Sequence, residues 1–225
     1  MNKKNSQTKQ ILSMAYENHR KGNLKLAESL YKKIIKIESN NFEPVFLLGT
    51  LLLQKKNFDD AIPLLEKAIL MEPNHANSYQ NLGFALIEIG EFVKAVEVLK
   101  KAIKIQPNHV EAHFNLANVY KQMRDFKKAR MFYEKTIEIQ PNNPSAFNNL
   151  ANVYKQLGEF TKAIASFRLL ATEYVPSLVN AVSALIWDFA RWRSSGSAPL
   201  LIIFAYSSKI PFSISSQGSS PELKR

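Results

Sequence analysis

Residues 79–107 read YQNLGFALIEIGEFVKAVEVLKKAIKIQP, and this stretch decides the fold. Its pattern recurs with a period of 34 residues, because Pro73, Pro107 and Pro141 each stand in a similar phrase, MEPNH, IQPNH or IQPNN. Self-similarity at a fixed period is typical of proteins in which every repeat is one supersecondary unit. The sequence therefore predicts a stack of similar units.

Aligning the chain on this period produces columns of small and of large residues. One column is alanine in all five units: Ala27, Ala61, Ala95, Ala129 and Ala163. Another column contains only alanine or glycine, including Gly49 and Gly83, and the column before it contains Met14, Leu48, Leu82, Leu116 and Leu150. Close packing explains both, since only a small residue fits where two helices cross closely and a large one fills the space beside the crossing.

Each unit is predicted to contain two amphipathic helices, because its apolar residues recur at steps of three and four. Gly22, Gly90 and Gly158 stand between the two helices, where a helix C-terminus favours a left-handed residue. The predicted helix pairs are 8–21 with 25–38, 42–55 with 59–72, 76–89 with 93–106, 110–123 with 127–140, and 144–157 with 161–172.

The columns resemble the tetratricopeptide repeat, whose pattern of aromatic, Leu-Gly, alanine and proline positions is matched by Tyr79, Leu82-Gly83, Ala95, Ala102 and Pro107. The resemblance covers residues 8 to about 170 and implies an all-α fold, a right-handed α-solenoid of about five helical hairpins. The repeats would occupy about 8–41, 42–75, 76–109, 110–143 and an incomplete 144–172, after a disordered segment 1–7. Stacking stabilises such hairpins, since none can bury its apolar face alone.

The same resemblance implies that the first helix of each hairpin lines a concave groove. Asparagine recurs there: Asn81, Asn115 and Asn149 form one column, and Asn118 and Asn152 form another column three residues further on. An asparagine amide both donates and accepts, so a ladder of them can hold the backbone of an extended peptide. The phrase NLANVY, which occurs twice, resembles the superhelical arm of O-linked N-acetylglucosamine transferases, where an asparagine ladder holds protein substrates.

Alternatives stay open for these residues. The asparagines can equally be ordinary consensus residues of the repeat that contact no ligand. Lys121 and Lys155 either give the groove a cationic edge for acidic peptides or are solvated helix ends, because lysine is favourable near a helix C-terminus. A clamp for a terminal carboxylate, as in chaperone-tail binders, is not expected, because Phe114 and Asn148 stand where its leading lysine is needed.

Charge and composition exclude several classes of function. The net charge of +11 would suit a nucleic-acid partner, but the lysines are spread through nine of the ten predicted helices, often beside glutamate, so a solvated surface is expected and no nucleic-acid partner. The chain has no cysteine, which excludes disulfides and thiolate sites and suits a cytoplasmic location. It is predicted not to be an enzyme and to need no cofactor, since it lacks phosphate-loop, nucleophile-elbow and dinucleotide motifs. No metal site is predicted either, because His109 and His113 have no third ligand placed by the sequence.

The repeat pattern ends after Phe167, and the composition changes with it. Residues 177–225 contain 12 serines and 2 lysines, whereas residues 1–176 contain 7 serines and 21 lysines. We expect residues 173–193 to form a capping helix and residues 194–225 to be a poorly ordered tail. The switch is interpreted as a junction produced by truncation, fusion or a frame change, with a membrane contact through residues 199–206 as the competing interpretation.

The predicted function is a protein-interaction scaffold that binds a peptide or a partner protein in the concave groove, with no membrane partner. The alternative is a substrate-recruiting arm of a larger glycosyltransferase-like enzyme whose catalytic part is missing from this sequence.

Overall fold

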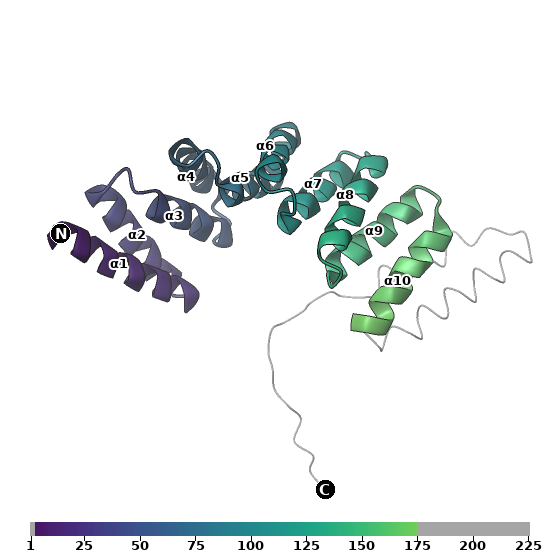
Figure 1. The fold of residues 1–225 in the computed structure, drawn as a ribbon, viewed down its shortest axis with the longest axis horizontal. Helices are drawn as coiled ribbons and strands as arrows, with labels where there is room; N and C mark the ends of the chain where they lie inside the picture. Colours follow the sequence, from purple (N-terminus) through teal and green to yellow (C-terminus); the bar gives the residue numbers. More distant parts are fainter. Residues whose placement is uncertain (1–2, 175–225) are drawn as a thin grey trace, which may run out of the picture. The chain divides into compact units, whose positions relative to one another are not determined.

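The computed structural model describes the backbone of residues 3–174 and the side chains of residues 7–167. This part of the chain contains ten α-helices and no strand, and the helices follow one another as hairpins (Figure 1). The predicted all-α solenoid is confirmed. The helices are α1 (Lys3–Arg20), α2 (Leu24–Ile37), α3 (Phe42–Gln54), α4 (Phe58–Met71), α5 (Ala76–Glu88), α6 (Phe92–Ile105), α7 (Val110–Gln122), α8 (Phe126–Ile139), α9 (Pro144–Gln156) and α10 (Phe160–Tyr174).

The helix bounds lie within two residues of the predicted ones, with the exception of the start of α1. That helix begins at Lys3, so the prediction that residues 3–7 are disordered was wrong. The segment is rich in lysine and glutamine, which are good helix formers, and contains no glycine or proline to stop the helix. Of the predicted cap 173–193 and tail 194–225, everything beyond the end of α10 lies outside the described residues.

Neighbouring helices pack in chain order, and the odd-numbered helices also pack on one another. From α1 to α9 each helix contacts the next, and in addition α3 contacts α5 and α5 contacts α7. Within the described residues no two even-numbered helices make a comparable contact. The first helices of successive hairpins therefore form one common surface, with the second helices behind it.

The small residues of the repeat lie in the contacts between helices. The five column alanines are 0–5% exposed, and each belongs to an even-numbered helix. The large residues in the leucine column are buried in α3, α5, α7 and α9, whereas Met14 in α1 is 54% exposed. Within the described residues, the member of this column in the first helix is therefore the exposed one.

The turns inside the hairpins share one backbone conformation. Gly22, Gly90 and Gly158 have φ values of 81°, 82° and 75°, as the sequence predicted. Lys56 and Arg124 occupy the same column in the other two repeats and also have positive φ values, of 56° and 60°. An L-residue carries an energetic cost in this left-handed region, so these two turns keep their shape against local preference.

Candidate functional site

The residues predicted to bind a ligand lie where neighbouring odd-numbered helices adjoin. Hydrogen bonds between their side chains run from α3 to α5 and from α7 to α9. We call this surface the odd-helix face. Its predicted polar residues are Asn81, Asn115, Asn118, Asn149, Asn152, Lys121 and Lys155, and its half-buried apolar residues include Phe46, Leu47, Phe84 and Phe114.

Asn81 links two repeats. Its Nδ2 donates to Thr50 Oγ1 across 3.0 Å, and the two residues stand 31 positions apart on α5 and α3. The partner belongs to the preceding repeat and stands three positions after the residue that corresponds to Asn81 there. The offset is therefore 31 rather than the full period of 34. This amide is therefore partly used inside the protein, a role that the sequence analysis did not foresee.

A larger network joins α7 to α9 with the same offset. Asn149 Nδ2 donates to Asn118 Oδ1 at 3.4 Å, and Lys121 Nζ donates to Asn149 Oδ1 at 3.1 Å. The hydroxyl of Tyr133 on α8 donates to the same Asn118 oxygen at 2.5 Å. These bonds fix both amides in orientation, and they join the fourth repeat to the fifth.

Asn115 is the exception among the three column asparagines. Its side chain is 9% exposed and forms no hydrogen bond within the described residues. The residue 31 positions earlier, where Asn81 finds Thr50 and Asn149 finds Asn118, is Phe84, and a phenyl ring offers no lone pair or N–H. The ladder is thus interrupted at its centre, and the amide of this largely buried residue reaches solvent without a partner among the described residues.

Asn152, Lys155 and Lys121 differ in their surroundings. Asn152 is exposed, and its Nδ2 donates to the backbone oxygen of Asn148 at 3.0 Å, a bond within its own helix. Lys155 is half-buried and stands one repeat after Lys121. Burial lowers the pKa of Lys121, because desolvation disfavours the charged ammonium. A carboxylate brought to this ammonium would restore part of the lost solvation.

The chemical character of the odd-helix face changes along the chain. The column that contains Asn81, Asn115 and Asn149 has Leu47 in the second repeat. The column of Lys121 and Lys155 has Leu53 in the second repeat and Ile87 in the third. Apolar groups therefore dominate at α3, and amide and ammonium groups dominate at α7 and α9. A ligand that lies along the face meets two different environments.

The two histidines considered as metal ligands have structural partners. His109 Nδ1 accepts from the backbone N–H of Ala112 at 3.4 Å, which caps α7, and its Nε2 donates to Asn77 Oδ1 at 2.8 Å. His113 Nε2 donates to the backbone oxygen of Pro107 at 2.8 Å. Over the described residues, no group of three or more potential metal ligands comes together.

Comparison with known proteins gives the same picture of the repeats. Family models of the tetratricopeptide repeat match residues 19–83, 52–108, 110–143 and 132–165. A crystal structure of MamA is 30% identical to this chain, with a TM-score of 0.66. The match covers 70% of this chain and 92% of the MamA chain. The chain belongs to the tetratricopeptide-repeat family. As a tetratricopeptide-repeat protein, it is a protein-interaction scaffold.

Further matches extend the comparison of this tetratricopeptide-repeat protein. Another MamA structure is 29% identical with a TM-score of 0.67, over 73% of this chain and 90% of that one. A thermophilic tetratricopeptide-repeat protein of Thermus thermophilus is 19% identical with a TM-score of 0.60, over 80% of this chain and 99% of that one, and shows the fold alone. Among curated proteins there is no match.

The matching family models are all models of the repeat itself, so they leave the likeness to a glycosyltransferase arm as a prediction. None of the helices in residues 3–174 has both the length and the apolar character needed to cross a bilayer.

Sequence reasoning missed the partners of the asparagines. The sequence contained the necessary information. The residues 31 positions before the three column asparagines are Thr50, Phe84 and Asn118, of which the first and the last are polar and Phe84 is apolar. Comparing each asparagine with the residue 31 positions before it identifies Asn115 as the one without a polar neighbour.

Proposed function

We propose that the odd-helix face binds an extended segment of a partner protein and that Asn115 is the central contact. The observation that carries the proposal is that Asn115 is largely buried while its amide, which still reaches solvent, has no hydrogen bond within the described residues. The polar atoms of this amide still reach solvent, because the fully buried, unpaired side-chain atoms of the described residues are His113 Nδ1 and Arg130 Nε. A peptide C=O or N–H placed against the amide would form a hydrogen bond with a net value of roughly 0.5–1.5 kcal/mol.

The neighbouring asparagines support the proposal by holding the face in shape. Asn81 and Asn149 are fixed by bonds to Thr50 and Asn118, and each keeps unused hydrogen-bonding capacity. A surface that is already ordered loses less conformational entropy when a ligand binds. We therefore assign a positioning role to these two residues and direct contact to Asn115.

The apolar and cationic groups beside Asn115 set the preferred chemistry of the ligand. Phe84 and Phe114 are half-buried and leave part of each ring accessible. Lys121 lies six residues, about one and two-thirds turns, after Asn115 on the same helix. A segment with an apolar side chain near the rings and an acidic side chain near Lys121 is the ligand that this arrangement favours.

The decisive variant is Asn115→Leu, which copies Leu47 at the same position of the second repeat. Peptides are first selected from a random extended-peptide library on the wild-type chain, and their affinities are then measured by fluorescence anisotropy. We expect Asn115→Leu to weaken binding about tenfold, the equivalent of one hydrogen-bonding contact of roughly 1.4 kcal/mol. Its melting temperature should not fall, because no bond within the protein is lost.

Two further variants make the result specific. Asn108→Ala changes an exposed asparagine in a turn and should leave binding unchanged. Asn81→Ala removes an existing bond, so we expect it to lower stability as well as affinity. If the selected peptides bind Asn115→Leu as tightly as wild type, the assignment of Asn115 is wrong.

Two further expectations remain predictions. A cytoplasmic location is one, since it rests on composition. The other is the recruiting arm of a glycosyltransferase, for which finding a catalytic domain encoded downstream would be the test.

A further inference from the structure

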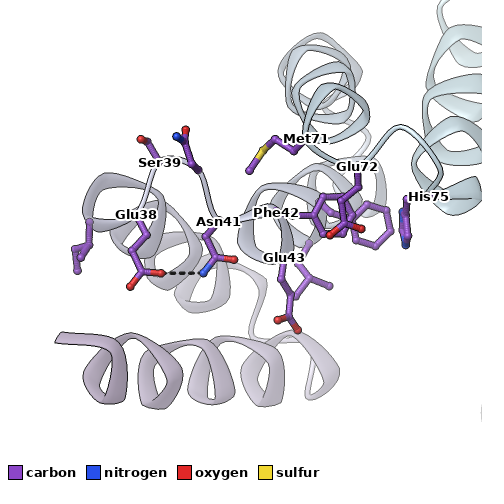
Figure 2. Close-up of a pocket in the computed structure, with 12 residues that line it drawn as sticks. Glu38, Ser39, Asn41, Phe42, Glu43, Met71, Glu72 and His75 are labelled. Atoms are coloured by element: carbon purple, nitrogen blue, oxygen red, sulfur yellow. Dashed lines mark hydrogen bonds between the residues drawn. The ribbon is translucent and has the colours of Figure 1, made fainter. Parts of the chain in front are cut away.

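A hollow of about 1290 Å³ lies beside the loop between α2 and α3. Figure 2 shows its wall, which is built from that loop, the start of α3, the end of α4 and His75 before α5. Its lining includes the carboxylates of Glu38, Glu43 and Glu72. None of the lining residues in this described region is a lysine or an arginine, although the whole chain carries a net charge of +11.

Three rings form the apolar side of the hollow. Phe42 and Phe46 stack with centroids 5.7 Å apart, and His75 stands edge-on to both, at 4.9 Å and 4.7 Å. Phe42 and Glu72, both labelled in Figure 2, line the same hollow. An aromatic surface beside a carboxylate suits a cation, because the ring face attracts positive charge and the stem of a lysine or arginine packs on the ring.

The internal repeats show that these acidic residues are not a requirement of the fold. Glu38 and Glu72 each directly follow an even-numbered helix, and the same column continues with Gln106 and Gln140. A negative charge at a helix C-terminus opposes the helix dipole, so helix stability does not favour glutamate there. The acidic residues occur only in the two repeats whose loops line the hollow.

We propose that this hollow docks a basic segment of a partner protein, whose arginine or lysine side chains lie against Phe42 and pair with Glu43 and Glu72. The argument is one of charge complementarity, because Glu43 and Glu72 form no ion pair with lysine or arginine within the described residues. The rest of this positively charged chain repels a basic segment. The hollow shares Phe46 and Leu47 with the odd-helix face but does not include Asn115. It calls for a ligand of opposite charge to the one favoured near Lys121.

The test uses the full chain and two labelled decapeptides, one with four arginines and two leucines and one with glutamine in place of every arginine. The variant Glu43→Asn with Glu72→Gln copies Asn77 and Gln106 of the third repeat, so it is expected to fold. We expect the basic peptide to bind wild type better than the neutral peptide, and the double variant to weaken its binding about five- to tenfold, as two partly exposed ion pairs would. Raising the salt concentration should weaken it as well.

The matched control is Glu66→Gln with Glu97→Gln, which removes the same two charges from exposed sites on α4 and α6. Equal weakening in the control and the test variant would overturn the proposal, since only net charge would then matter. Equal binding of the basic and the neutral peptide would also overturn it. Sedimentation velocity tests whether a second copy of this chain is the occupant. Self-association of the wild type that Glu43→Asn with Glu72→Gln abolishes would replace the partner protein with another copy. Asn115→Leu should leave the basic peptide bound, so failure here and failure at the odd-helix face are distinguishable.

Discussion

Leu99 of α6 lies so close to Gly83 of α5 that a Cβ atom added to Gly83 would stand 2.6 Å from its Cγ. The leucine is completely buried, so it has little room to move. We expect Gly83→Ala to destabilise the protein by roughly 1–3 kcal/mol, as overpacking does, in spite of the better helix propensity of alanine. Urea unfolding would measure the loss.

Gly49→Ala is the control for that variant. There the nearest atoms are those of Leu65 at 3.1 Å, a contact that a small shift relieves. We expect a change of less than about 1 kcal/mol, because the gain in helix propensity offsets the tighter contact. If both substitutions cost the same, the closeness of Leu99 is not the cause.

Lys56 and Arg124 are predicted to be sites where glycine stabilises the protein. Both occupy the left-handed turn position that is glycine in the other three repeats. Glycine adopts this left-handed conformation at a cost lower by roughly 1 kcal/mol than that of an L-residue. Lys56→Gly and Arg124→Gly should therefore each raise the melting temperature. Gly90→Ala is the reverse change, and it should lower the melting temperature through backbone strain alone, because a Cβ there contacts nothing within 4 Å. A lower melting temperature in the two glycine variants would contradict this account.

His109 is predicted to make stability depend on pH. Burial lowers its pKa, with Glu111 3.4 Å away acting in the opposite direction. The unfolded chain, with a histidine pKa of about 6.5, then binds protons more readily than the folded protein. The stabilisation is therefore complete above about pH 6.5 and is lost as the pH falls through the lower pKa of the folded state.

The variant His109→Asn separates this effect from other titrations, including that of His75, whose pKa burial also lowers. Asn143 shows that asparagine caps at this column, since its Oδ1 accepts from the backbone N–H of Ala146 at 3.0 Å. We expect the variant to lose less melting temperature between pH 7.5 and pH 5 than wild type. If the melting temperature of the variant falls with pH as much as that of the wild type, His109 is not the cause.

Tyr133 is predicted to support the position of Asn118. Tyr133→Phe removes the hydroxyl that donates to Asn118 Oδ1 and should cost roughly 0.5–1.5 kcal/mol. The hydroxyl of Tyr79 has no hydrogen bond within the described residues, so Tyr79→Phe should change stability by less than about 0.5 kcal/mol. Denaturant unfolding of both variants would show whether the difference exists.

The period of 34 residues was sufficient to predict the helices and their small contact residues, because packing between repeats imposes the same choice each time. The turns at Lys56 and Arg124 could not be assigned from their residue types, since the left-handed conformation is imposed there by neighbouring hairpins. The asparagine bonds were not foreseen because they depend on a 31-residue offset between two columns. The hollow at Glu38 and Glu72 depends on side chains of two repeats meeting, which no single repeat pattern encodes.

The bonds around Asn149 also bear on cooperativity. In a solenoid, a bond that crosses from one hairpin to the next strengthens their interface and adds nothing to either hairpin alone. Lys121 with Asn149 and Arg130 with Glu159, at 2.7 Å between Nη1 and Oε1, are two such crossings between the last two repeats. We therefore expect these two hairpins to unfold together. A protease should then cleave the turn between them only after both hairpins have unfolded.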